Sequence, residues 1–367
     1  MIFFLLSILS TLTLEEKVGQ TLIAHFRGEE ANTDAKVLID QAHVGGIIYY
    51  NWANGLHSPE QVRTLSNGLQ ALAKTPLFIA VDQEGGRVAR LQKGFTQFPG
   101  NGALGMTGKP EMAEAAALTM GREMRAAGVN FNFAPVVDVN SNPKNPVIGN
   151  RSFSDKPEVV VEFADKALAG YRQAGVVACL KHFPGHGDVS TDSHYELPVV
   201  NKSRSELDAV ELLPFRKLAS SVDTIMTAHI VVPAIDPEHC ATLSPAVLNV
   251  LRKDIGFNGL IVSDSLVMEG VLKNCGGSVD EAAIRALEAG CDLLVLGGKC
   301  LIGDATNELT VHDVVRVHRS IVNAIRNGRW SEEKLNASVE RILTLKHKFK
   351  PTQIALQTLE AERKLSK

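Results

Sequence analysis

Short apolar segments alternate with longer amphipathic segments along most of this 367-residue chain, and this alternation constrains the fold more than any other feature. An apolar run without alternating polar residues is typical of a parallel strand that is buried on both faces. Eight such runs occur, at residues 21–26, 44–50, 77–81, 129–139, 176–180, 224–232, 260–264 and 292–296. Eight strand–helix units predict an α/β protein with a single closed (β/α)8 barrel, a TIM barrel, rather than an open doubly wound sheet.

The segments between these runs have helical periodicity, and their ends carry residues that start or stop helices. Ser58, followed by Pro59, and Ser278, followed three residues later by Glu281, predict helix N-termini. Three glycines stand where a helix C-terminus favours positive φ, between a helical stretch and an apolar run: Gly128, Gly175 and Gly290. Helices are therefore expected at residues 58–74, 110–127, 157–174, 203–219, 244–254, 278–289 and 311–327, with a helical C-terminal tail at 331–367.

The sequence contains no Pro/Ser-rich linker that would divide it into two domains. We expect an apolar N-terminal lead over residues 1–11, one barrel domain over 12–347 and a tail over 348–367. Hydrophobic residues make up 45% and charged residues 22%, which excludes wholesale disorder. The net charge of −3 offers no basic surface for nucleic acid. Five cysteines without a CxxC pair predict reduced, structural thiols. Separately, the protein is expected to be a monomer.

The N-terminal segment is apolar but lacks the features of a complete export signal. Residues 2–9 read IFFLLSIL, the first basic residue is Lys17, and no small-x-small cleavage site follows. The run is also far shorter than the roughly 20 residues that span a bilayer. We therefore expect a cytoplasmic protein without stable membrane insertion, with export by a weak signal segment as the alternative.

Reacting groups of such barrels lie at the C-terminal ends of the strands and in the loops that follow. After the third run, the segment VDQEGGRVAR (residues 81–90) places five polar or charged residues at one barrel mouth: Asp82, Gln83, Glu84, Arg87 and Arg90. This crowding favours a rim that binds a polyol, with an internal ion-pair network as the alternative. After the fourth run, Asp138 and Asn140 lead into a loop that ends in IGNRSF, where Arg151 carries five donors suited to a substrate oxygen.

The loop after the fifth run is the richest in chemistry and reads KHFPGHGDVSTDSH, residues 181–194. Lys181 and His182 stand at the strand end and are expected to face the pocket. In an extended loop Asp192 and His194 project to the same side, so the carboxylate can orient the imidazole and stabilise its protonated form. Such a histidine can act as general acid and base near neutral pH. A metal site is the alternative, although the spacing lacks the i, i+4 histidine pair of a zincin.

Asp264 ends the seventh apolar run, in LIVSDSLVM. An aspartate directly after Leu-Ile-Val-Ser is costly to bury unless it is hydrogen-bonded or reactive, and a carboxylate there can be a nucleophile. A salt-bridged structural aspartate is the alternative. His229, after the sixth run, is expected to have a supporting rather than a catalytic role.

Taken together, these segments resemble the NagZ-type β-N-acetylhexosaminidases of glycoside hydrolase family 3, over roughly residues 12 to 345. VDQEGGRVAR, IGNRSF, KHFPGHG followed by DSH, and SDSL occur in the family's order. The resemblance implies a retaining hydrolysis of terminal β-linked N-acetylglucosamine from an amino-sugar oligosaccharide or a muropeptide, without metal or other cofactor. It implies that Asp264 is the nucleophile and His194 the acid/base with Asp192 as its partner. It also implies sugar-binding roles for five residues: Asp82, Arg90, Arg151, Lys181 and His182.

Three other functions fit parts of the pattern. A metal-dependent hydrolase would use the loop histidines His182, His186 and His194. A Schiff-base aldolase would use Lys181. A barrel that binds sugars without turning them over would need neither Asp264 nor the Asp192–His194 pair.

Overall fold

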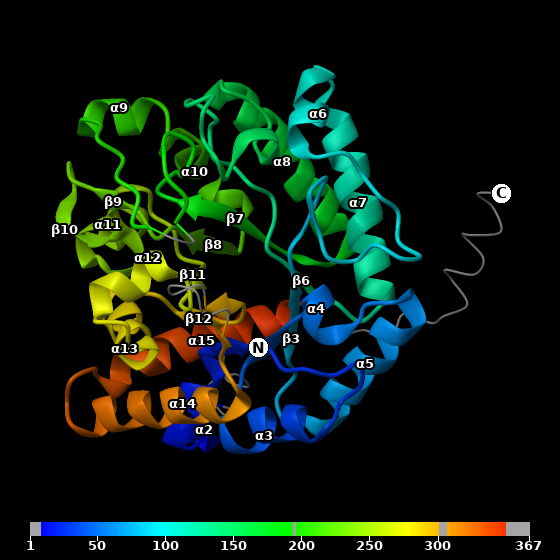
Figure 1. The fold of residues 1–367 in the computed structure, drawn as a ribbon, viewed down its shortest axis with the longest axis vertical. Coiled ribbons are helices and arrows are strands. Elements are labelled where there is room, and N and C mark those ends of the chain that lie inside the picture. Colours follow the sequence, from blue (N-terminus) through cyan, green and yellow to red (C-terminus); the bar gives the residue numbers. More distant parts are fainter. Residues whose placement is uncertain (1–8, 194–195, 301–306, 350–367) are drawn as a thin grey trace.

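The computed structural model describes residues 9–193, 196–300 and 307–349, and its centre is a closed parallel barrel (Figure 1). Neighbouring strands follow the chain order and the last pairs with the first, in parallel register such as Leu22 opposite Leu294. The strands are β1 (Leu22–Ala24), β2 (Gly46–Ile48), β3 (Phe78–Val81), β6 (Phe131–Asn132), β7 (Val177–Phe183), β8 (Thr224–Thr227), β11 (Leu260–Ser265) and β12 (Leu293–Leu296). Each overlaps one of the eight predicted runs, so the predicted barrel is confirmed.

Helices ring the barrel and cover the outer faces of its strands (Figure 1). They are α3 (Thr33–Gln41), α5 (Pro59–Leu72), α7 (Pro110–Ala126), α8 (Pro157–Ala174), α10 (Leu213–Leu218), α11 (Pro245–Asn249), α13 (Val279–Ala289) and α14 (Val311–Arg326). Further helices are α2 (Leu14–Gln20), α4 (Asn51–Asn54), α6 (Asn101–Met106), α9 (Arg204–Ala209), α12 (Glu269–Leu272) and α15 (Glu332–Lys348). Three hairpins sit in the loops: β4 (Gln83–Gly85) with β5 (Val88–Ala89), β9 (Val231–Val232) with β10 (Asp236–Cys240), and β13 (Lys299–Cys300) with β14 (Asn307–Glu308).

The predicted helix boundaries are confirmed where cap residues marked them. The side chains of Ser58 and Ser278 accept hydrogen bonds from backbone N–H groups three residues later. The three glycines predicted at helix C-termini all have positive φ: Gly128, Gly175 and Gly290.

Several expected elements differ from the structure. The helix expected at residues 203–219 is divided into α9 and α10, because Pro214 has no N–H group with which to continue a helix. The helix expected at 244–254 is α11 followed by a π-helical turn at Val250–Asp254. The strand expected at 129–139 is reduced to β6, since Pro135 also lacks a donor for a longer ladder. The sequence pattern did not identify α3.

Both ends of the chain extend beyond the described residues. Of the expected apolar lead, residues 1–8 lie outside them, as do residues 350–367 of the expected tail. The division into lead, barrel domain and tail therefore stays a prediction. None of the helices within the described residues is long and apolar enough to cross a membrane.

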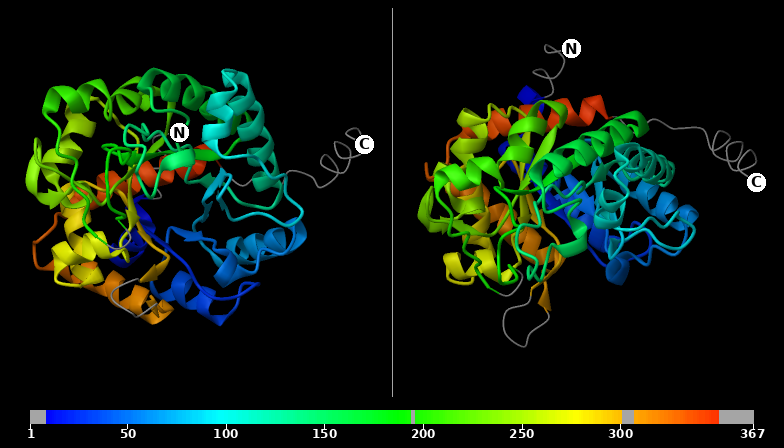
Figure 2. Two further views of the ribbon diagram at one scale, coloured as in Figure 1. Left: turned by 45° about the horizontal axis from the view of Figure 1, so that its top comes forward. Right: turned by 90° about the horizontal axis from the view of Figure 1, so that it is seen from above.

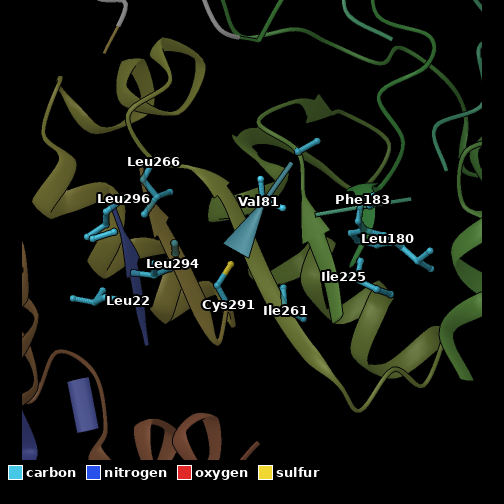
Figure 3. Close-up of a cluster of buried hydrophobic side chains, with 14 of the residues drawn as sticks. Leu22, Val81, Leu180, Phe183, Ile225, Ile261, Leu266, Cys291, Leu294 and Leu296 are labelled. Carbon is cyan, nitrogen blue, oxygen red and sulfur yellow. The ribbon is translucent and has the colours of Figure 1, made fainter. Parts of the chain in front are cut away.

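Alternating strand residues build two apolar layers. One side chain of each successive pair points outward and packs under the helices; Figure 3 shows this outer layer with Leu22, Ile225, Ile261, Leu294 and Leu296 among its labelled members. The other points into the barrel and forms an inner core with its neighbours from the other strands. The inner core includes Ile23, Ile48, Phe78, Ala80, Phe131, Phe133, Cys179, Met226, Val262 and Val295.

Helix α15 closes the N-terminal end of the barrel. Its residues Ile342 and Leu345 pack into the inner core, and in the right view of Figure 2 the helix (red) crosses one end of the barrel. Lys346 is buried in the same place, where its Nζ donates to Gln20 Oε1 at 2.7 Å and lies 5.1 Å from the Phe78 ring centroid. Burial lowers the pKa of Lys346 to about 7. Helix α15 therefore packs against the inner core at the end opposite the C-terminal ends of the strands.

Replacing Lys346 by Met is expected to remove a pH-dependent part of the stability. A lysine has a pKa near 10.5 in the unfolded chain and Lys346 about 7 in the folded one, so between these values the unfolded chain binds more protons. The stability contributed by this group therefore rises with pH across that window, by at most about 1.4 kcal/mol per pH unit. Urea unfolding at about pH 7.5 and about pH 9.5 should show the wild type gaining stability relative to Lys346→Met.

Lys334→Met is the matched control, because Lys334 is exposed on the same helix. It should follow the wild-type pH dependence. Wild-type and Lys346→Met stabilities that change in parallel would contradict the uncharged state of the buried lysine.

Candidate active site

The inward rows of side chains continue past the apolar core at the C-terminal ends of five strands. The continuing residues each stand two positions after a member of the inner core: Tyr50, Asp82, Lys181, Asp264 and Gly297. All five line a cavity of about 360 Å³, whose floor includes Ile48, Phe133, Met226 and Val295 of the inner core. The inward-facing positions are thus apolar in the core and include charged residues one layer further along the strands. The cavity lies at the end of the barrel where (β/α)8 barrels hold their active sites.

The structure brings together most of the residues predicted for the site. Six of them line this one cavity: Asp82, Arg90, Arg151, Lys181, His182 and Asp264. Asp192 directly precedes Ser193, which also lines the cavity, whereas His194 lies outside the described residues.

A buried cluster of cations and carboxylates forms one wall. Lys181 Nζ donates to Asp82 Oδ1 at 2.9 Å and lies 2.7 Å from Glu84 Oε1. Arg151 binds Glu84 through two parallel hydrogen bonds, of 2.9 Å from Nε and 2.8 Å from Nη2. Arg90 completes the cluster, with Nη2 3.6 Å from Asp82 Oδ2. Glu84 was noted in the sequence but not predicted as a site residue, because nothing local shows that it would be buried between two cations.

Mutual charge compensation keeps this cluster ionised. Burial acts to raise the pKa of Glu84, but Arg151 and Lys181 outweigh it and hold that pKa well below its usual range. Burial acts to lower the pKa of Lys181, but Asp82 and Glu84 outweigh it and raise that pKa. Lys181 is therefore an ammonium that can donate to a ligand oxygen. A protonated amine is not a nucleophile, so this environment disfavours the Schiff-base alternative.

A buried carboxylate orients His182 on the adjacent wall. Asp138 Oδ2 lies 2.6 Å from His182 Nδ1, and Asp138 Oδ1 accepts from the His182 backbone N–H at 3.1 Å. Burial acts to raise the pKa of Asp138, but His182 outweighs this effect and the pKa is lowered. The ring therefore donates from Nδ1 to the Asp138 carboxylate, and its Nε2 lies 3.5 Å from Arg151 Nη2. Asp138 is a second site residue that the sequence placed near a strand end without assigning it a role.

Asp264 stands at the end of β11 on a segment fixed by neighbouring strands. Its Oδ1 accepts from the Ser265 backbone N–H at 2.7 Å, and the Ser265 hydroxyl donates to the carbonyl of Gly297, which directly follows β12. His229 Nε2 lies 2.9 Å from the Ser265 carbonyl, and its Nδ1 lies 2.8 Å from Thr242 Oγ1. His229 thus supports the Asp264 segment from behind, in agreement with its expected supporting role.

Two aromatic residues that were not predicted for the site also line the cavity. Tyr50 and Trp52 stack with ring centroids 5.1 Å apart and planes 20° apart. Lys299 Nζ, from the β13–β14 hairpin, lies 5.2 Å from the Trp52 ring centroid. Tyr50 stands at the end of the second apolar run, and this position could have indicated a cavity residue. A tyrosine at that position is equally typical of the hydrophobic core.

Comparison with known proteins agrees with this architecture. Residues 13–345 match the model of the glycosyl hydrolase family 3 N-terminal domain. The chain belongs to glycoside hydrolase family 3. It is 40% identical to a β-hexosaminidase of Alkalilimnicola ehrlichii over 75% of this chain and 80% of that one. It is 34% identical to β-hexosaminidase A of Pseudoalteromonas piscicida, over 94% of this chain and 63% of the relative.

A solved structure of another family 3 protein has the same fold. The β-N-acetylglucosaminidase of a Paenibacillus species, strain FPU-7, superposes with a TM-score of 0.88 at 44% identity. The match covers 94% of this chain and 64% of the Paenibacillus chain. The predicted membership of glycoside hydrolase family 3 is therefore confirmed.

The described wall of the cavity in this family 3 protein consists of groups that bind polar oxygen atoms. Within residues 9–193, 196–300 and 307–349, no three or more His, Cys, Asp or Glu side chains are grouped so that they could hold a metal. His194, one of the three histidines of the metal alternative, lies outside those ranges. The wall instead presents an ammonium, guanidinium groups and carboxylates, which suit the hydroxyl groups of a polyol.

Glu84→Gln is expected to destabilise this family 3 protein by about 3 kcal/mol, because it leaves two buried cations with only part of their counter-charge. The free energy of unfolding in urea at about pH 7 measures the effect. Glu111→Gln is the control, since Glu111 is an exposed carboxylate in the first turn of α7. Equal stability of the two variants would show that Glu84 does not compensate Lys181 and Arg151.

Proposed function

We propose that this protein is a retaining β-N-acetylhexosaminidase that releases terminal, non-reducing, β-linked N-acetylglucosamine. The observation that carries the proposal is the presence of Asp264 and the Lys181–Glu84–Arg151 wall in one cavity at the C-terminal end of a family 3 barrel. The names of the relatives, β-hexosaminidase and β-N-acetylglucosaminidase, support the same activity. No metal or other cofactor is needed for this chemistry.

In this proposal each group of residues has a separate role in the reaction. Asp264 attacks the anomeric carbon of the sugar. His194, paired with Asp192, protonates the glycosidic oxygen. The hydroxyl groups of the sugar are bound by a set of polar side chains: Asp82, Arg90, Arg151, Lys181 and His182.

The reaction has two steps. In the first, an Asp264 oxygen forms an ester bond with the anomeric carbon while the bond to the leaving oxygen breaks, and that oxygen takes a proton from His194. In the second, His194 removes a proton from water, the water oxygen attacks the anomeric carbon, and Asp264 leaves as a carboxylate. Both steps pass through a transition state with positive charge on the sugar, which an anionic Asp264 stabilises.

A histidine acid complements the charges described for this cavity. Most retaining glycosidases pair the nucleophile with a second carboxyl group roughly 5 Å away. Here the acid/base is an imidazole, so a second carboxylate does not have to be kept protonated beside Asp264.

We further propose that the natural substrate is a peptidoglycan fragment, handled in the cytoplasm during cell-wall recycling. The resemblance of the four motifs to NagZ-type enzymes supports this choice, and the exposed ammonium of Lys299 at the cavity suits a carboxylate-bearing aglycone. A higher kcat/KM for a disaccharide of N-acetylglucosamine and muramic acid than for chitobiose would support it. The reverse order would favour chitin fragments.

Asp264→Asn is expected to lower kcat on an aryl β-N-acetylglucosaminide at least about 1,000-fold, or about 4 kcal/mol, because the amide cannot form the glycosyl ester. Mass spectrometry of the wild type after reaction with a fluorinated amino-sugar should locate the label on Asp264. Asp34→Asn, an exposed substitution in α3, is the control and should keep full activity. Near-wild-type turnover by Asp264→Asn, or a label elsewhere, would refute the assignment.

His194→Ala is expected to lower kcat/KM much more for substrates with poor leaving groups than for a dinitrophenyl glycoside. Only a basic leaving oxygen needs the proton, and general acid catalysis contributes about 100- to 10,000-fold. The measurement is a series of aryl and alkyl N-acetylglucosaminides of graded leaving-group pKa. A loss that is the same along the series counts against the acid role.

A further inference from the structure

His186 lines the cavity, and the proposed reaction does not use it. Its backbone N–H donates to Asp138 Oδ1 at 2.6 Å, and its carbonyl accepts from Asn145 Nδ2 at 2.8 Å. The residue is only 2% exposed. His186 is therefore held by residues that follow β6, independently of the chain that comes after it.

The side chain of His186 reaches the far part of its own loop. Its Nε2 lies 2.9 Å from Ser193 Oγ, and Ser193 is buried. Ser193 stands between Asp192 and His194. This hydrogen bond therefore connects a fixed point at the base of the loop to the middle of the segment that carries the acid/base pair.

Ser193 is also held from the opposite side. Its carbonyl accepts from the backbone N–H of Gly270 at 3.3 Å. A Cβ at Gly270 would lie 2.8 Å from the Ser193 carbonyl oxygen and 2.6 Å from that of Glu196, so this approach requires glycine. Gly270 lies in α12, shortly after Asp264 in the chain. Ser193 thus joins the loop after β7 to the segment after the strand that bears the nucleophile.

The charge state of His186 suits a permanent structural contact. Burial lowers its pKa to about 4 against the opposing effect of Asp138, and His182 and Arg151 also disfavour the protonated ring. His186 is therefore neutral between pH 5 and 8. The hydrogen bond between its Nε2 and Ser193 Oγ therefore joins two uncharged groups, while its Nδ1 has no hydrogen-bond partner among the described residues.

We propose that His186 and Gly270 are positioning residues. Together they hold Ser193 in place, and through Ser193 they position the Asp192–His194 pair relative to Asp264. The inference rests on the proposed function, in which His194 is the acid/base. Asp138 then has two tasks, because the same carboxylate orients His182 toward the sugar and anchors His186 beneath Ser193.

Ser193→Ala tests the side-chain half of this contact. It should lower kcat/KM about 10- to 100-fold for alkyl N-acetylglucosaminides or chitobiose, and less than about threefold for the dinitrophenyl glycoside, because a misplaced acid affects only leaving groups that need a proton. KM for the dinitrophenyl substrate and the thermal midpoint should stay near wild type. Ser190→Ala is the matched control, since Ser190 is exposed on the same loop.

Gly270→Ala tests the backbone half independently. The added methyl group displaces Ser193 without touching its hydroxyl, and alanine favours a helical position such as this one in α12. The same leaving-group-dependent loss is expected. Losses that are equal for all leaving groups, or no loss in either variant, would overturn the positioning role.

His194→Ala, measured on the same substrates, separates this inference from the proposed function. If that variant shows the leaving-group dependence while Ser193→Ala and Gly270→Ala do not, only the positioning role fails. If His194→Ala shows none, the acid/base assignment itself fails.

Discussion

The two-residue period of side chains along parallel strands decides where the polar groups of this protein lie. Positions that face inward are apolar through the barrel core and become polar in the next layer, at residues such as Asp82, Lys181 and Asp264. Helix α15 covers the opposite end of the barrel. The same geometry that packs the core therefore points these polar groups into one cavity.

Burying so many charges is tolerable only because they compensate one another. Glu84 is placed between Lys181 and Arg151, and Asp82 takes the remaining contact of Lys181. Removing one partner leaves the others with only part of their counter-charge in a poorly solvated place, which costs more than an exposed ion pair contributes. The result is a set of donors and acceptors already oriented before a sugar arrives, so binding need not spend energy on ordering them.

The Asp138 carboxylate connects the strand-borne part of the site to the loop after β7. Asp138 holds His182 on the strand-borne wall and His186 at the base of the loop, and His186 contacts Ser193. A short chain of hydrogen bonds therefore connects His182 to Ser193, which stands between the two residues proposed to deliver the proton.

The sequence by itself determined the barrel, because strands that are buried on both faces occur in the sequence as continuous apolar runs. Cap residues and glycines mark the helix ends between these runs. It also indicated which strand ends contribute polar residues to the cavity. Only the tertiary structure decided which charges pair: Glu84 and Arg151 are 67 residues apart, and Asp138 and His182 are 44 apart. It also decided that Tyr50, a member of the inner core, and Trp52, which packs against that core, both line the cavity. Charge pairing depends on distance across neighbouring strands, and that distance exists only once the barrel has closed.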